Sequence, residues 1–257
     1  NPEKPGSAAL KTDKCKIKTL RRQTMEYNVQ KISLQQANED VRRRFISGVY
    51  GWMMLALAIS GAAAFVTANS QTMLKLIFGN PIVFFGLIIA EFALVITLSA
   101  RIRTMSRTAA AGSFIAYSLI NGLTLASIFL MYTSASITKV FLASALMFGG
   151  MSLYGMKTKS DLRSAGRYLM MALIGIIAAS IINIIFRSSQ LDWLISIVTV
   201  VVFTGLTAYD TQKLMTISVY ADGSENFQKV AVIGALQLYL DFVNIFLSLL
   251  RLFGKRR

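Results

Sequence analysis

Seven long hydrophobic runs occupy most of the chain after about residue 45, and short polar stretches separate them. We place the predicted spans at 46–68, 81–100, 109–132, 137–156, 167–187, 191–212 and 230–252. Each run is close to the length of about 20 residues that an α-helix needs to cross a bilayer. A soluble core could not bury so many helices that are apolar on all sides. The pattern therefore predicts an all-α integral membrane protein, folded as one bundle of seven transmembrane helices.

The first 45 residues differ from the rest because they are polar and basic. They hold 11 Lys and Arg against 5 Asp and Glu, and they contain no long hydrophobic run. We interpret 1–45 as a basic cytosolic N-terminal tail and 46–257 as the transmembrane domain. Basic segments beside a membrane are attracted to anionic lipid headgroups. The predicted partner is therefore the lipid bilayer, with anionic lipid at the tail.

Basic residues in or beside the connections between spans predict the orientation of the bundle. The second, fourth and sixth connections are the more basic ones, with Arg101, Arg103 and Arg107, then Lys157, Lys159, Arg163 and Arg167, then Lys213 and Lys229. Because cytosolic loops are enriched in Lys and Arg, we expect these connections and the N-terminus in the cytosol. Seven crossings leave Lys255–Arg257 on the far side, against the rule. A re-entrant last segment would remove that conflict, but its run of about 23 residues is long enough to span.

Composition excludes several classes of function. The net charge of +15 comes from the tail and the connections, so it indicates membrane topology and anionic lipid rather than a nucleic-acid partner. The chain has no His and one Cys, Cys15. This excludes a disulfide framework, a zinc site and every nucleophile that depends on histidine. We expect a protein that is not an enzyme and that holds no permanently bound cofactor.

Glu91, Asp210 and Asp241 are acidic residues that lie inside predicted spans. Membrane insertion penalises such a residue by about 2.5 to 3.5 kcal/mol unless a partner or water compensates, so intramembrane acids are candidates for a functional site. Calcium prefers oxygen ligands, which Asp210, Asp241 and the accessory Asn244 could supply. Two nearby carboxylates cannot both ionise cheaply. We therefore hypothesise that acidification protonates the pair, weakens calcium binding and changes a gate.

Residue counting gives the three acids different depths in the membrane. With Trp193 at the outer interface, Asp210 lies about 25 Å along its helix, near the cytosolic face of a core of about 30 Å. Asp241 and Glu91 both fall near the middle of their spans, which favours Glu91 as a neighbour of the last helix. A tilt, a kink or a cytosolic vestibule must close a gap of about 10 Å between the aspartates. The count alone does not pair them.

Two segments carry a family resemblance. They are Gly205-Leu206-Thr207-Ala208-Tyr209-Asp210-Thr211-Gln212-Lys213 and Gly234-Ala235-Leu236-Gln237-Leu238-Tyr239-Leu240-Asp241-Phe242-Val243-Asn244, followed by the ending Leu249-Leu250-Arg251-Leu252-Phe253-Gly254. With these segments the chain resembles the bacterial branch of the transmembrane Bax-inhibitor-motif family, from about Val49 to the C-terminus. The resemblance implies a seven-helix bundle with the last helix at its centre, and a calcium leak whose rate depends on pH.

The resemblance also implies roles for individual residues. The aspartates that match Asp210 and Asp241 form a pair that shares protons and governs opening, with calcium as the transported ion. An arginine near the cytosolic end of the second helix engages the pair, and Arg101 and Arg103 both qualify. Glu91 looks like the family's membrane glutamate. The implied location is a bacterial inner membrane, with the endoplasmic reticulum as the alternative.

Two other functions fit parts of the sequence. Tyr209-Asp210 followed by Asp241 imitates an intramembrane aspartyl protease, but the second aspartate of those enzymes sits in Gly-x-Gly-Asp and a Pro-Ala-Leu motif follows. Here Tyr239-Leu240 precedes Asp241, and no proline follows Pro81. The other alternative is an interaction protein that restrains cell death or a membrane protease through an unidentified protein partner, with any ion flux incidental.

Overall fold

The computed structural model describes residues 39–102 and 104–257, and seven helices in these ranges are long and apolar enough to cross a membrane. This confirms the predicted all-α membrane fold. The helices are Glu39–Ala68, α3 (Pro81–Arg101), α4 (Arg107–Met131), α5 (Ser134–Lys157), α6 (Arg163–Phe186), α7 (Ser189–Ser218) and α8 (Glu225–Phe253), with the short α2 (Gln71–Phe78) before α3. Residues 1–38 of the predicted tail, with Cys15, lie outside the described residues. So does the candidate latch residue Arg103.

Small polar residues between the hydrophobic runs determine where most helices begin. The side chains of Ser70, Asn80, Ser106, Thr133 and Ser188 each accept a hydrogen bond from a backbone amide in the first turn of the next helix. Such caps satisfy donors that have no partner within the helix. They allow connections of only a few residues, so consecutive spans run antiparallel and close together.

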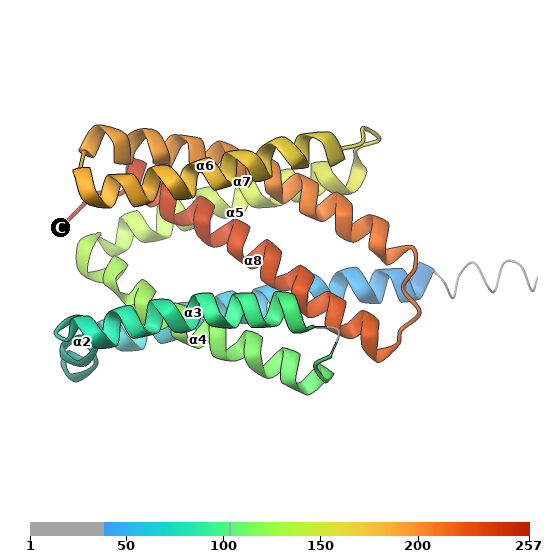
Figure 1. Cartoon of the computed structure of the whole chain (residues 1–257), viewed down its shortest axis with the longest axis horizontal. Helices are drawn as coiled ribbons and strands as arrows, with labels where there is room; N and C mark the ends of the chain where they lie inside the picture. The colour runs from blue at the N-terminus through green and yellow to red at the C-terminus, as the bar shows by residue number, and fades with distance from the viewer. Residues whose placement is uncertain (1–38, 103) are drawn as a thin grey trace, which may run out of the picture. The chain divides into compact units, whose positions relative to one another are not determined.

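Helix α8 lies at the centre of the bundle, as the family resemblance implied. In its most hydrophobic window 67% of the residues are buried, compared with 6% in α3 and in α6. Figure 1 shows α8 running obliquely between α5, α6 and α7 on one side and α3 and α4 on the other. It packs most extensively against α7, then against α5 and α4. A helix that is surrounded by protein tolerates polar residues that lipid-facing helices do not.

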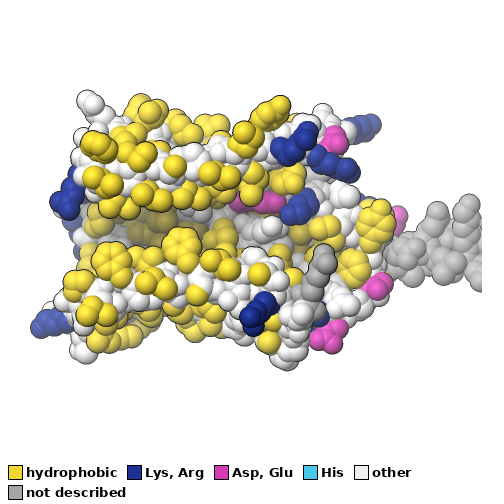
Figure 2. Space-filling model, in the orientation of Figure 1, with side chains coloured by type: hydrophobic (Ala, Val, Ile, Leu, Met, Phe, Trp, Pro, Cys, Tyr) yellow, Lys and Arg dark blue, Asp and Glu magenta, His cyan; other side chains and the backbone are white. Residues whose placement is uncertain are grey.

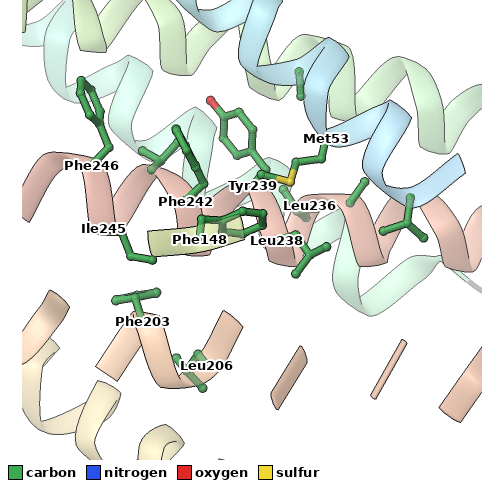
Figure 3. Close-up of a cluster of buried hydrophobic side chains, with 14 of the residues drawn as sticks. Met53, Phe148, Phe203, Leu206, Leu236, Leu238, Tyr239, Phe242, Ile245 and Phe246 are labelled. Carbon is green, nitrogen blue, oxygen red and sulfur yellow. The ribbon is translucent and has the colours of Figure 1, made fainter. Parts of the chain in front are cut away.

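Aromatic and aliphatic side chains of α8 form the core of the bundle. Figure 3 shows Tyr239, Phe242 and Ile245 of α8 among side chains from the first helix, α5 and α7. Tyr239 is fully buried and meets Phe114 and Tyr117 of α4 edge-on, with ring centroids 6.0 and 5.7 Å apart. Edge-to-face aromatic pairs stabilise by about 0.5 to 1.5 kcal/mol beyond the area they bury. The core thus fixes the rotation of α8 about its axis.

Two glycines allow helices to approach α7 closely just before Asp210. A Cβ atom on Gly155 of α5 would overlap the carbonyl oxygen of Ala208, and one on Gly166 of α6 would overlap the ring of Tyr209. Small residues permit such approaches between membrane helices. The backbone of α7 is therefore held from two sides in the turn that carries Asp210.

The C-terminal helix α8 is long enough for a full crossing, and its tail is bonded to another part of the bundle. This helix is continuous over 29 residues, about 43 Å. Its tail then pairs with the turn between α4 and α5: Thr133 N donates to Lys255 O (3.1 Å), Arg257 N donates to Met131 O (3.0 Å), and Lys255 N donates to Ser136 Oγ (2.8 Å). The tail thus lies at the end of the bundle where α4 finishes, and the last segment is not re-entrant.

Candidate functional site

Asp210 of α7 and Asp241 of α8 lie close enough for their charges to interact. Both are buried, with 9% and 3% of their surface exposed. The oblique crossing of α8 against α7, seen in Figure 1, closes the gap in depth that straight helices would leave. Helix α7 continues eight residues past Asp210, to Ser218. Asp210 therefore does not mark the end of a helix, and the two carboxyl groups lie within range of each other's charge.

One oxygen of Asp241 has no hydrogen-bond partner. Its Oδ2 atom is buried and unpaired, and among the described residues no basic side chain forms an ion pair with Asp210 or Asp241. The charge of Lys213, one turn further along α7, acts on Asp210. A buried carboxylate without donors is costly unless a proton, a cation or water compensates. The pair therefore has unused capacity to bind one of these.

Hydroxyl groups of three helices meet at Thr211, the residue after Asp210. Thr211 Oγ1 lies 3.3 Å from the hydroxyl of Tyr50 and donates to Ser152 Oγ at 3.5 Å. The first helix, α5 and α7 thus meet at the residue after Asp210. Sequence reasoning did not single out Tyr50, Ser152 or Thr211, because isolated hydroxyl residues are common in membrane helices and carry no signal of their own.

Glu91 is linked to α8 indirectly, through α4. Thr124 Oγ1 donates to Glu91 Oε1 (2.7 Å), and Asn121 Nδ2 donates to Glu91 Oε2 (3.3 Å). The oxygen of the same Asn121 amide accepts a hydrogen bond from the hydroxyl of Tyr239 at 2.8 Å. Residue counting along the spans placed Glu91 at the depth of the middle of α8, and this connection agrees with that prediction. Tyr239 was missed as a polar group because its ring also suits a hydrophobic core.

The other candidate residues lie apart from the aspartates or are engaged elsewhere. Arg101 is exposed at the last position of α3, and it forms no ion pair with the described residues. Asn244 donates its side-chain amide to Leu240 O at 2.8 Å, one turn back on its own helix. The gating role of Arg101 and the accessory role of Asn244 stay predictions.

The pair does not resemble a dedicated metal site. Over residues 39–102 and 104–257, no three His, Cys, Asp or Glu side chains come together as ligands. Calcium takes six to eight oxygens, so an ion at the pair would draw its other ligands from hydroxyls, carbonyls or water. Figure 2 shows acidic side-chain atoms beside a basic side chain in a hollow between the two rows of helices, within a largely hydrophobic surface.

The fold and the site together define a multi-pass membrane protein with ionisable side chains in the interior of its bundle. The family model described as "Inhibitor of apoptosis-promoting Bax1" matches residues 42–257. The chain belongs to this Bax inhibitor family, as the two segments around Asp210 and Asp241 indicated.

Bacterial relatives match over nearly the whole bundle. The chain is 48% identical to the inner membrane protein YbhL of Escherichia coli K12 over 215 residues, which is 83% of this chain and 92% of that protein. It is 43% identical to an uncharacterized protein of Borreliella burgdorferi over 88% of this chain and 99% of that one, and 38% identical to the uncharacterized protein RP147 of Rickettsia prowazekii over 84% and 91%. These matches support a location in a bacterial inner membrane.

Proposed function

We propose that this protein is a pH-sensitive calcium leak channel in which Asp210 and Asp241 bind the passing ion and respond to protons. The observation that carries the proposal is the unpaired, buried Oδ2 of Asp241 within range of the charge of Asp210, on the most buried of the spanning helices. Membrane proteins retain costly intramembrane acids mainly along ion and proton pathways. The pair offers four carboxylate oxygens to a cation, and protons compete for the same oxygens.

The proposed route begins at the end of the bundle where α7 finishes. Asp210 lies eight residues from Ser218, about 12 Å from this end of α7. The basic connections predict that this end faces the cytosol, with the N-terminus on the same side and anionic lipid at the tail. Calcium would reach the pair from here, and displacement of α8 relative to α7 would open the remaining path. Arg101 lies at this end too and is the described candidate for a latch.

A protein-interaction role is the second candidate, because the matching family model carries the description of an inhibitor of Bax1. The two roles differ in what they require of the aspartates, since an interaction role does not need them charged. We propose no enzymatic role and no resident cofactor. The residues before Asp241 lack the Gly-x-Gly pattern of intramembrane aspartyl proteases.

Calcium uptake by proteoliposomes tests the leak directly. The wild type, Asp210→Asn and Asp241→Asn are compared from pH 6 to pH 8 over a range of calcium concentrations. Protonation removes the negative charge that attracts calcium, so in the wild type the half-saturating calcium concentration should rise as the pH falls. Each variant lacks one of the carboxylates. Its half-saturating concentration at pH 8 should be about tenfold higher or more, equivalent to about 1.4 kcal/mol, with a weaker pH response.

Asp222→Asn is the matched control, because it removes the same charge from the connection between α7 and α8. Hydrogen bonds from the side chain and backbone of Ser224 lower the pKa of the exposed Asp222 carboxyl below its ordinary value. It therefore stays ionised from pH 6 to pH 8 and cannot produce the response. Wild-type flux and pH dependence in both buried-site variants would contradict the proposal. Protection of cells by a double variant without flux would favour the interaction role.

A further inference from the structure

Two side chains near the N-terminal end of α8 form hydrogen bonds with the connection between α3 and α4 and with the first residue of α4. Lys229 Nζ donates to the carbonyl oxygen of Met105 at 3.1 Å, and Glu225 Oε1 accepts from the backbone amide of Arg107 at 3.0 Å. Met105 N in turn donates to Arg101 O at 3.0 Å, in the turn that ends α3. Two side chains one turn apart on α8 are thus bonded to two backbone groups of the same short connection.

Lys229 is an unusual residue for this position. It is only 8% exposed, and no carboxylate of the described residues lies within ion-pair distance of it. Removing an ammonium group from water is costly unless its donors are satisfied. The carbonyl oxygen of Met105 supplies the compensation here. Lys229 therefore reaches the connection between α3 and α4 one residue before Ser106, the N-cap of α4.

Glu225 binds the same region. It accepts a hydrogen bond from the amide of Arg107, the first residue of α4, where free amides give a helix end partial positive charge. Lys229 and Glu225 of α8 thus bind a carbonyl oxygen and an amide on either side of Ser106, the N-cap of α4. Phe227, between them, packs edge-on against Phe45 of the first helix, with ring centroids 6.1 Å apart. Simple packing would not require two opposite charges in this order.

We propose that Lys229, with Glu225, is a positioning residue that fastens the connection between α3 and α4 to α8 and thereby keeps the calcium leak low. The inference rests on the proposed function. Lys229 lies 12 residues before Asp241 on the same helix, about 18 Å along its axis. Because α8 is continuous between them, movement of α8 at the aspartate pair requires movement at Lys229. The fastening holds α8 against the end of α3 that carries Arg101, and its release frees α8 to move.

Hydrogen–deuterium exchange tests the fastening without reference to transport. The full chain is reconstituted in lipid nanodiscs, and exchange is compared in the wild type, Lys229→Met, Lys229→Arg and Lys159→Met. Met preserves the length and apolar packing of the side chain, whereas Arg also preserves the charge and the donors. Lys159 is an exposed lysine of the connection between α5 and α6 and serves as the control. We expect several-fold faster exchange of the amides at 104–107 in Lys229→Met alone.

Calcium uptake by the same variants tests the consequence. Lys229→Met should raise the resting leak several-fold at pH 8, Lys229→Arg should restore it to near the wild-type rate, and Lys159→Met should leave it unchanged. Unchanged exchange at 104–107 in Lys229→Met would overturn the fastening. Faster exchange with an unchanged leak, in a protein whose leak responds to Asp241→Asn, would overturn its role in holding the leak low. Absence of flux in the wild type would instead refute the proposed function, and the exchange data would still decide whether the fastening exists.

Discussion

The two ends of α8 are attached to the bundle in different ways. Its N-terminal end is held by Lys229 and Glu225, whose side chains bond the connection between α3 and α4. Its C-terminal end is held mainly through the main chain, because the amides of Thr133 and Arg257 bond carbonyl groups across the tail and the turn between α4 and α5. Ser136 Oγ and the half-exposed pair of Arg251 with Asp192 add side-chain contacts there. Main-chain bonds persist through most substitutions, whereas side-chain bonds depend on particular residues. The N-terminal end is therefore the end at which sequence can adjust the movement of α8.

The residues packed around α8 also differ between its middle and its C-terminal part. Around its middle it carries Asp241 and meets the turn of α7 that holds Asp210. Further along, Phe242 and Phe246 pack against Phe141 of α5, with ring centroids 5.4 and 6.0 Å apart. An apolar cavity of about 120 Å³ lies beside them, lined by hydrophobic side chains of the first helix, α4, α5 and α8. The aspartate thus lies near the middle of α8, between the end held by Lys229 and Glu225 and the apolar part that follows.

The largest effect outside the aspartates is expected from Gly155→Ala. The added methyl group would overlap the carbonyl oxygen of Ala208 and push α5 away from the turn of α7 that carries Asp210. Overpacking of this kind costs about 1 to 3 kcal/mol. The free energy of unfolding, measured by titration with SDS, should fall by this amount, and the calcium leak should change with it.

Gly149→Ala and Gly150→Ala on the same helix are the matched controls, because a Cβ atom on either glycine meets no other atom within 4 Å. Both should retain wild-type stability and leak. A loss of stability as large in these variants as in Gly155→Ala would show that helix propensity or lipid contact, and not the approach of α5 to α7, sets the effect.

The smallest effect is expected at the opposite end, from Asp192→Asn. Asp192 in the first turn of α7 pairs with Arg251 in the last turn of α8, at 3.8 Å, and both side chains are nearly half exposed. Exposed ion pairs contribute about 0 to 1 kcal/mol. The free energy of unfolding, measured by titration with SDS, should change by no more than this. The calcium leak and its pH response should stay at the wild-type level. A large change in leak would mean that the C-terminal end of α8 also moves during opening.

Hydropathy was sufficient to place the seven helices, because each span must hide its backbone from lipid. It placed the end of α7 too early and the beginning of α8 too late. Residues such as Gln212 and Lys213 lower the mean hydropathy, yet α7 continues to Ser218, and α8 begins at Glu225 rather than near 230. Polar residues continue a helix where it leaves the hydrocarbon, and a hydropathy window ends there.

The candidate site was predictable in its residues but not in its geometry. Asp210, Asp241 and Glu91 stand out because charge is rare in spans. Their arrangement depends on the oblique crossing of α8 and on the amide of Asn121, which residue counting does not contain. Lys229 was treated as a sign of orientation, since its partner is a backbone carbonyl and no residue type marks such a partner. Sequence reasoning therefore found the acidic residues inside the spans and missed the lysine whose partner is a main-chain carbonyl.

The central claim is that Asp210 and Asp241 act as one unit, and a double-mutant cycle on calcium uptake tests it most directly. Groups that act together give strongly non-additive effects. The account predicts that the variant with both Asp210→Asn and Asp241→Asn has about the same half-saturating calcium concentration and pH profile as the more impaired single variant. The account would be contradicted if the fold-changes in half-saturating calcium concentration of the two single variants multiplied in the double variant. A pH response that is lost only in the double variant would contradict it as well.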